Sequence, residues 1–271
     1  MVVVVFLLVV LVGVSLGLIG GGGSVLTVPI LVYFMGINPV LATSYSLFIV
    51  GSTSMVGAVI NYRKGFVCLH TAILFGLSSI TTVYLTRKIL LPAIPPVIYK
   101  TDHLQITKST ATMMLFALLM LLAATAMIRS KKKNITNEIC IFDRSNYIPK
   151  LLFYGILIGI ITGLLGVGGG FLLIPTLVFI IKKPMKEAIG TSLLIIALNS
   201  LIGFTGDIGH FIMQWDFLFM VTLMAIGGIF LGGFLAKKIN GESLKKVFGW
   251  FVLVMGIYIF VREIIFVCTA M

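Results

Sequence analysis

The sequence predicts an all-α polytopic membrane protein made of two inverted repeats, each a glycine-broken hairpin helix plus three transmembrane helices. Three observations lead to this fold class: a strongly apolar composition, short basic runs between long apolar stretches, and a motif that occurs twice. The mean hydropathy of the 271 residues is +1.19, with 59% of residues hydrophobic and 10% charged. A soluble core of this length could not hide so many apolar side chains, so the chain belongs in a lipid bilayer.

Charge and cysteine content exclude several function classes. Twenty basic residues stand against eight acidic ones, but the basic residues lie in short runs between apolar stretches, which indicates membrane topology and not nucleic-acid binding. The three cysteines, Cys68, Cys140 and Cys268, are widely spaced and form neither a disulfide framework nor a metal motif. We therefore expect no metal and no cofactor. The first apolar run has no basic region before it and no cleavage site after it, so we expect it to stay in the mature protein.

A repeated motif divides the chain into two units. GLIGGGGSVLTVP at 17–29 aligns without a gap with GLLGVGGGFLLIP at 163–175, and seven of the thirteen positions are identical. In nearly the same register, Thr43 and Ser44 fall on Thr191 and Ser192, and Asn61 falls on Asp207. The predicted domains are a first membrane repeat at 1–129, a cytoplasmic basic linker at 130–147 and a second membrane repeat at 148–271.

Each unit is expected to begin with a helix that breaks at its glycines and resumes as a short apolar piece. Three longer apolar segments follow in each unit, all near the roughly 20 residues that a membrane span needs. They cover about 38–62, 67–91 and 108–128, then 187–207, 212–236 and 244–266. A long external loop at 92–107 has no close counterpart in the second unit.

The basic residues decide how the broken segments cross. If each crosses once, nine Lys and Arg lie on one side and eleven on the other. If each turns back, the units are inverted and the split becomes fifteen against five, which matches the excess of basic residues in cytoplasmic loops. We therefore predict a multi-pass protein of the plasma (inner) membrane, with the Arg129–Lys150 loop in the cytoplasm and both termini outside.

Two helix breaks at equivalent places of inverted halves predict a substrate site near the midplane, because unwound backbone in hydrocarbon survives only where it is buried or lines a polar cavity. The six long segments have no Lys or Arg near their middles, so amides and hydroxyls are expected to bind an anion. The predicted substrate-binding residues are Gly20, Gly21, Gly22, Gly23, Ser24, Thr43, Ser44, Gly166, Gly168, Gly169, Gly170, Thr191, Ser192 and Asn199. Structural or gating roles are assigned to Pro29, Pro175, Asn61 and Asp207.

A plainer reading stands beside this one. Glycines and small residues also let membrane helices pack closely without a ligand, and Gly13 and Gly159 are expected to do only that. Ser44 and Ser192 are equally well explained as packing or helix-bonded hydroxyls. All eight carboxylates lie in loops or near segment ends, so no intramembrane proton relay is expected. Asp207 and His210 are read as a solvated loop pair, with a gate or weak proton site as the alternative.

The two motifs, GGGG-S-x-L-x-x-P followed by A-T-S and GVGGG-F-L-L-I-P followed by A-I-G-T-S, resemble the TauE/SafE family of sulfite exporters over nearly the whole chain. The resemblance implies membrane transport of a small sulfur-containing anion such as sulfite, thiosulfate or a sulfonate, often outward. The expected partners are this anion and the lipid bilayer; no nucleic acid is expected, and a homo-oligomer is left open. We expect a secondary transporter and not an enzyme, with an anion channel or an intramembrane hydrolase as alternatives.

Overall fold

The computed structural model describes residues 2–95, 97–101, 104–129, 144–181, 183–210, 213–235 and 241–269. These residues form helices joined by short connections, with a single pair of short strands among the described elements. The predicted all-α membrane architecture is confirmed, with the strand pair as a small addition at one end.

The first half of the chain begins with a helical hairpin. α1 (Val2–Ile19) stops at Gly20, whose φ of 76° is a backbone conformation that glycine adopts without steric cost. The chain then continues as one irregular helix made of the 3-10 turn η1 (Gly21–Leu26), α2 (Thr27–Pro29) and the π-helix η2 (Ile30–Phe34). The π-helix begins directly after Pro29, because proline has no N–H to close an ordinary helical turn.

The second half begins in the same way. α7 (Arg144–Leu165) ends before Gly166, which has a φ of 66°, and the chain resumes as α8 (Gly170–Pro175) and the π-helix η4 (Thr176–Ile180). The π-helix again follows the proline directly. Both predicted hairpins are therefore present, and each returning helix starts at a glycine of its cluster.

Six long helices follow the hairpins, three in each half. In the first half they are α3 (Pro39–Arg63), α4 (Leu69–Leu85) with its extension through η3 (Thr86–Leu90) and α5 (Leu91–Ala93), and α6 (Lys108–Arg129). In the second half they are α9 (Met185–Thr205), α10 (Trp215–Leu235) and α11 (Gly241–Thr269). All six coincide with the predicted apolar segments.

The outer faces of these helices are apolar. Five helices in the described part of the chain are long and apolar enough to cross a membrane. Large hydrophobic side chains such as Leu77, Leu223 and Phe234 are more than 60% exposed on the bundle surface. Exposing so large an apolar surface to water is unfavourable, whereas contact with lipid tails is not. The chain is therefore a multi-pass membrane protein.

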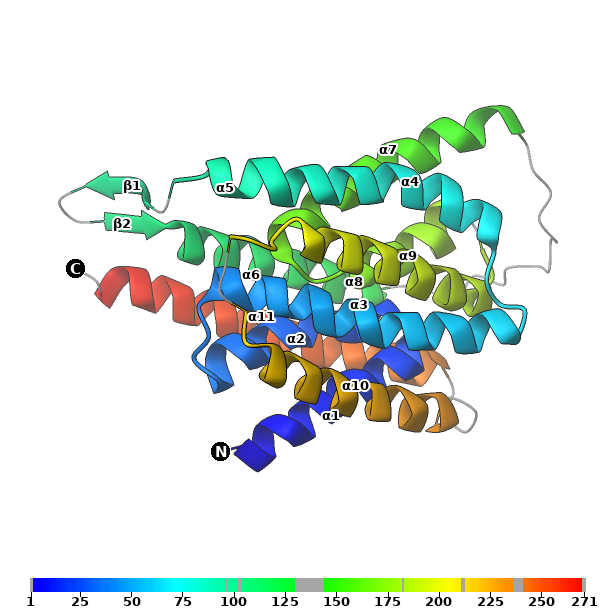
Figure 1. Cartoon of the computed structure of the whole chain (residues 1–271), viewed down its shortest axis with the longest axis horizontal. Coiled ribbons are helices and arrows are strands. Elements are labelled where there is room, and N and C mark those ends of the chain that lie inside the picture. The colour runs from blue at the N-terminus through cyan, green and yellow to red at the C-terminus, as the bar shows by residue number, and fades with distance from the viewer. Residues whose placement is uncertain are drawn as a thin grey trace.

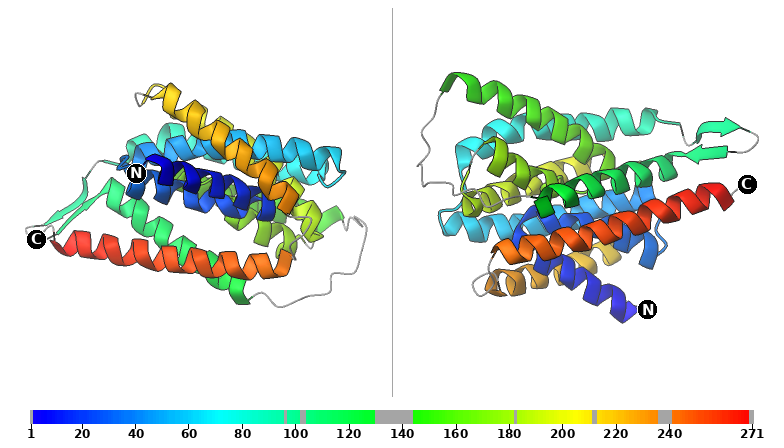
Figure 2. Two further views of the ribbon diagram at one scale, coloured as in Figure 1. Left: turned by 90° about the horizontal axis from the view of Figure 1, so that it is seen from below. Right: turned by 180° about the vertical axis from the view of Figure 1, so that it is seen from behind.

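Helix directions define two ends of the molecule (Figure 1). α1 starts at the end where both chain termini lie, which we call the terminal end, and α7 starts at the opposite end, which we call the linker end. α3 runs toward the linker end and α9 runs back toward the terminal end. The views from below and behind show the same placement of the termini (Figure 2).

The helices of the two halves pack against each other in matching pairs. α1 lies along α10 and α7 lies along α4, while α3 packs on α9 and α6 packs on α11. Gly13 of α1 contacts the backbone of α10 at Ala225 and Gly228, and Gly159 of α7 contacts α4 at Ser79 and Thr82. The packing role predicted for Gly13 and Gly159 is therefore confirmed, because a Cβ at either position would clash with the neighbouring helix.

The loop at 92–107 contains the strand pair. β1 (Val97–Thr101) and β2 (Leu104–Thr107) pair antiparallel between α5 and α6. Figure 1 shows this hairpin projecting at the terminal end. The second half has no counterpart among the described residues.

Candidate transport site

The two glycine breaks meet inside the bundle. Gly21 of η1 and Gly170 of α8 approach so closely that a Cβ built on Gly21 would lie 2.7 Å from the carbonyl carbon of Gly170, and one on Gly170 would lie 2.6 Å from that of Gly21. Only two glycines permit such an approach of two backbones. The first hairpin therefore crosses the second at their breaks, as the sequence predicts for two paired broken helices.

The other glycines of the first break face apolar or already bonded groups. A Cβ on Gly20 would lie 3.0 Å from the Ile189 side chain, and one on Gly23 would meet Ser15 and Leu16 of α1. Ser24 is fully buried and donates to the carbonyl of Gly21 at 2.7 Å. Gly22 lies within η1 between them. These contacts shape the first break, and the one side-chain hydroxyl within it, that of Ser24, is already bonded.

The second break faces polar side chains. A Cβ built on Gly168 would lie 2.7 Å from the hydroxyl oxygen of Ser200. One built on Gly169 would collide with the hydroxyl oxygen of Thr162. Gly166 packs against Thr43 and the guanidinium of Arg87. Polar side chains therefore surround the second break more than the first.

Several predicted hydroxyls are already engaged. Thr43 donates to the carbonyl of Val40 at 2.7 Å and Ser192 donates to that of Ile189 at 2.9 Å, both within their own helix. The Thr191 hydroxyl accepts the backbone N–H of Cys68 at 3.0 Å. These three match the reading of helix-bonded or packing hydroxyls.

Other buried polar atoms have no hydrogen-bond partner among the described residues. Near the second break they are the Ser200 and Thr162 hydroxyls and the amide nitrogen of Asn199, whose oxygen accepts from Ser79 at 2.9 Å. Ser46 and Ser54 of α3 and Thr27 of α2 add three more hydroxyls. A buried polar group without a partner costs about 1–3 kcal/mol, so such atoms concentrate where a ligand or bound water completes them.

A buried ion pair lies beside the second break. Asp207 Oδ2 accepts hydrogen bonds from Arg87 Nη1 at 2.7 Å and from Ser44 Oγ at 2.5 Å. The side chains of Arg87 and Ser44 are completely buried, and that of Asp207 is 1% exposed. Two sequence-based expectations are wrong here. Asp207 is not a solvated loop residue, and the protein does place a cation beside the glycines.

The sequence hides this cluster for two reasons. Arg87 lies near the end of its apolar segment, where a basic residue is normally read as facing the membrane surface. Its burial follows from packing at Gly206. A Cβ built on Gly206 would lie only 3.1 Å from the Cβ of Arg87, so the glycine lets the end of α9 lie close to the extension of α4. One available signal is Pro92, which lies just beyond the π-helix η3 that contains Arg87.

The cluster takes Ser44 and Arg87 from the first half and Asp207 from the second, and among the described residues the repeat-related positions do not form a second one. Gly163 packs on Thr86 of α4, whereas its repeat partner Gly17 packs on Gly232 and Gly233 of α10. α10 thus carries glycines where α4 carries Thr86 and Arg87. Asn61, the repeat partner of Asp207, donates to the carbonyl of Gly57 at 2.9 Å within its own helix. Pro29 and Pro175 do match, as the residues that precede η2 and η4.

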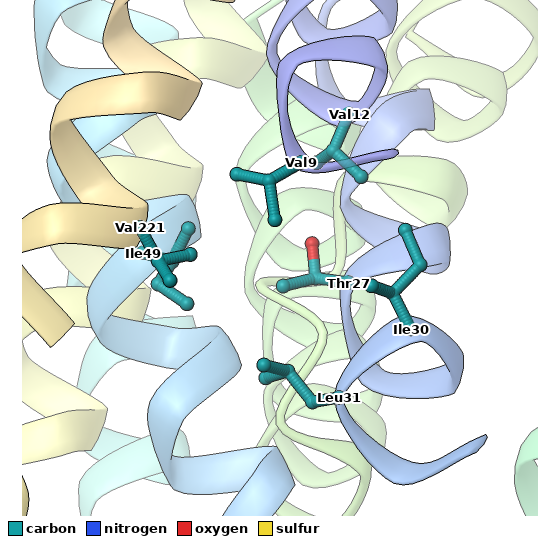
Figure 3. Close-up of a pocket in the computed structure, with 7 residues that line it drawn as sticks. All are labelled: Val9, Val12, Thr27, Ile30, Leu31, Ile49 and Val221. Carbon is teal, nitrogen blue, oxygen red and sulfur yellow. The ribbon is translucent and has the colours of Figure 1, made fainter. Parts of the chain in front are cut away.

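A separate small pocket lies between α1, α2, η2, α3 and α10 (Figure 3). Its walls are apolar apart from Thr27, whose hydroxyl points into it. An anion would lose its hydration there without gaining charged or multiple polar partners. This pocket is therefore not the anion site.

Among the residues that the structure describes, no three His, Cys, Asp or Glu side chains lie together to hold a metal ion.

At the linker end, Cys68 contacts two groups that favour its thiolate. Its Sγ lies 3.3 Å from Thr71 Oγ1 and 3.3 Å from Lys183 Nζ. Partial burial raises the pKa of the thiol, but the hydrogen bonds from Thr71 and Lys183 and the Lys183 charge together lower it below its usual value.

The arrangement of membrane-crossing helices around two broken hairpins and a buried polar site defines the class of this protein as a membrane transporter. The chain belongs to the TauE/SafE family, because the sequence model described as "Sulfite exporter TauE/SafE" matches residues 5–259. The resemblance read from the glycine motifs is thus confirmed.

Curated relatives carry transporter names. A "Probable membrane transporter protein" of Xylella fastidiosa strain 9a5c is 29% identical over 263 residues, which cover 93% of this chain and 92% of the relative. The "Probable membrane transporter protein YunE" of Bacillus subtilis is 24% identical over 84% of this chain and 85% of its own length. The "Probable membrane transporter protein MJ0441" of Methanocaldococcus jannaschii is 33% identical over 41% of this chain and 44% of its own length. No solved structure matches the chain.

Proposed function

We propose that the protein is a secondary transporter that exports a small sulfur-containing oxyanion, such as sulfite, thiosulfate or a sulfonate, by alternating access between two inverted halves. The observation that carries this proposal is the meeting of the two helix breaks at Gly21 and Gly170, with unpartnered buried polar atoms beside the second break. Broken helices paired in this way form the substrate site of many secondary transporters.

The inverted arrangement is supported by helix direction and packing. α1 and α7 start at opposite ends, and each packs on the second long helix of the other half. A carrier built from inverted halves can expose one site to either side by moving one half against the other. The excess of basic residues toward the linker end favours a cytoplasmic linker and a plasma-membrane location with both termini outside.

The substrate class follows from the family and from the donor atoms. The family description names sulfite export, and the polar atoms at the second break include hydroxyls and an amide N–H, which suit the several oxygens of a sulfur oxyanion. Asn199, Gly166, Gly168, Gly169 and Gly170 are the predicted binding positions that keep this role in the proposal, and Ser200 joins them through its unpartnered hydroxyl. Gly20 to Gly23, Ser24, Thr43, Thr191 and Ser192 form its surrounding frame.

The test is uptake by proteoliposomes that contain the purified protein and are offered labelled sulfite, thiosulfate, sulfate, a sulfonate or a carboxylate. We expect saturable uptake of at least one sulfur anion. Uptake that rises linearly with concentration would indicate a channel instead. Absence of uptake for all five anions by folded protein would contradict the proposed function.

Site variants must separate binding from folding. Gly169→Leu would force a side chain into a left-handed backbone against Thr162, so loss of activity there could reflect misfolding. Ser200→Ala removes one unpartnered hydroxyl and should leave or slightly raise the melting temperature while raising KM about tenfold. The matched control is Ser192→Ala, on the same helix, whose hydroxyl is bonded to Ile189. An unchanged KM in Ser200→Ala would remove that residue from the site.

A further inference from the structure

Arg87 uses only one of its three guanidinium nitrogens in hydrogen bonds to described residues. Nη1 binds Asp207 at 2.7 Å and lies 3.4 Å from Ser44 Oγ. Nε and Nη2 are fully buried and have no hydrogen-bond partner among the described residues. A buried cation with two unused donor nitrogens is costly, because the donors lose water and gain nothing in return.

The unpartnered Nη2 lies against the second helix break. A Cβ at Gly166 would collide with Nη2 of Arg87 and with Thr43, so Nη2 points at this glycine turn. The contributing residues come from both halves: Ser44 and Arg87 from the first, Gly166 and Asp207 from the second. Arg87 also lies on η3, and π-helical turns inside α-helices are frequent at functional sites.

The surrounding charges leave an excess of one positive charge. Among the described residues that act on one another here, Arg87 and Lys108 are cations and Asp207 is the one anion. Lys108 begins α6, and its ammonium bonds the carbonyl of Leu91 in α5. One bound monovalent anion would neutralise the cluster, whereas a divalent anion would reverse its charge.

We propose that the Nε–Nη2 edge of Arg87 is the binding site for the transported anion, and that this anion is singly charged and offers two oxygens of one atom to this edge, as a sulfonate or hydrogen sulfite can. Nε and Nη2 are parallel donors at a fixed spacing, and they match two such oxygens in a bidentate contact. Asp207 and Ser44 hold Nη1 and so fix the orientation of this edge. The inference rests on the proposed function, of which it specifies the binding group and the charge of the substrate.

A purely structural ion pair is the competing explanation. It would account for the contact of Nη1 with Asp207, since breaking a buried pair is strongly destabilising. It does not account for Nε and Nη2, which make no hydrogen bond to Asp207. The two explanations can be separated by variants that keep or neutralise the ion pair but remove the guanidinium edge. A purely structural pair predicts an unchanged response to anions in such variants, and a binding site predicts its loss.

The deciding variant is Arg87→Lys, which keeps a cation near Asp207 but offers no pair of parallel donors. Its matched control is Lys88→Gln, the neighbouring exposed cation, which bonds Tyr84. A second variant, Arg87→Gln with Asp207→Asn, replaces the ion pair by a neutral one in case Arg87→Lys fails to fold.

Two measurements are made on each protein: the change in melting temperature of purified protein on adding methanesulfonate, acetate, chloride or sulfate, and the KM for methanesulfonate uptake by proteoliposomes. For the wild type and Lys88→Gln we expect methanesulfonate to raise the melting temperature more than chloride or sulfate does. In Arg87→Lys and in the double variant this rise should vanish, and KM should increase at least tenfold.

The outcomes distinguish this inference from the proposed function. Uptake by the wild type with an unchanged KM in both Arg87 variants would overturn the Arg87 site and leave the transporter standing. A melting shift that needs Arg87, without uptake by the wild type, would support the site and contradict the transporter. Equal responses to chloride and methanesulfonate, or no melting shift with any of the four anions, would overturn the assignment of a bidentate anion site.

Discussion

Arg87 of η3 and Asp207, which follows α9, form a buried hydrogen-bonded ion pair of 2.7 Å that joins the two halves of the chain. Ser44 of α3 completes it with a hydrogen bond of 2.5 Å to the same carboxylate oxygen. Charges removed from water to this extent are retained only when each is paired, so the three residues should behave as one unit.

The ion pair should be needed for stability. Asp207→Ala leaves the Arg87 guanidinium buried without its counter-ion and should destabilise the protein by about 3–5 kcal/mol. Thermal melting of the detergent-solubilised protein measures the loss. Asp216→Ala is the control, because Asp216 is exposed at the start of α10 and should change stability by less than about 0.5 kcal/mol. Equal melting temperatures for the two variants would contradict the buried pair.

Ser44 and Ser192 are repeat partners that make different contacts. Ser44→Ala removes a hydrogen bond to a buried carboxylate and should cost about 1.5–3 kcal/mol. Ser192→Ala removes only a bond to the carbonyl of Ile189 and should be nearly neutral. The same melting assay compares them, and a larger effect at Ser192 would show that the repeat partners have been assigned the wrong roles.

The crossing of the hairpins should tolerate no side chain. Gly21→Ala places a methyl group on the backbone of Gly170 and should lower both the melting temperature and the yield of folded protein. Gly227→Ala is the matched control, because nothing lies within 4 Å of a Cβ built there. Size-exclusion chromatography after solubilisation reports the folded fraction. Equal folded fractions for the two variants would rule out the close crossing.

The Cys68 thiol should react at lower pH than an ordinary cysteine. Its folded pKa is lowered, so the thiolate is populated below the pH at which an unfolded cysteine ionises, and alkylation should begin there. The contribution of this group to stability is present above its unfolded pKa and is lost as the pH falls through the folded pKa.

The measurement is the pH dependence of iodoacetamide labelling in a Cys140→Ser, Cys268→Ser background. Lys183→Met should move the labelling curve to higher pH, because it removes a hydrogen bond to Sγ and a nearby positive charge. Lys64→Met, an exposed cation near the same loop, is the control. A curve that Lys183→Met leaves in place would contradict the assigned cause of the shift.

Membrane topology can be tested by labelling from each side. A tag at residue 1 should be accessible only from outside and a cysteine within 131–138 only from the cytoplasm, as the distribution of basic residues predicts. Membrane-impermeant reagents applied to intact cells and to inverted vesicles measure both. Labelling of both positions from one side would contradict the inverted topology.

The scaffold could be read from the sequence because it depends on local signals. Long apolar segments, the glycine clusters and the prolines at 29 and 175 each dictate backbone structure within a few residues. The structure contains all six long helices and both hairpins near the predicted positions. The roles of Gly13 and Gly159 followed from the same kind of signal, since small residues on a membrane helix indicate close packing.

The charged part of the candidate site could not be read in this way. Arg87 and Asp207 are distant in the sequence, and each lies near a segment end, where solvation is the usual state of a charge. Their burial depends on how the end of α9 folds over α4, which is a tertiary effect. Ser44 illustrates the same point. The fold brings its hydroxyl to Asp207, whereas the hydroxyl of its repeat partner Ser192 bonds the carbonyl of Ile189 in its own helix.

The Arg87–Asp207 pair has no counterpart at the repeat-related positions, Gly233 and Asn61, and this has an energetic consequence for a molecule built from matching halves. If the two halves were chemically identical, a conformation open at one end and its counterpart open at the other would have equal energies. α10 carries Gly232 and Gly233 where α4 carries Thr86 and Arg87, so this degeneracy is broken. The ion pair ties the extension of α4 to the end of α9, and in a carrier of the proposed kind such a tie favours the conformation closed at the terminal end.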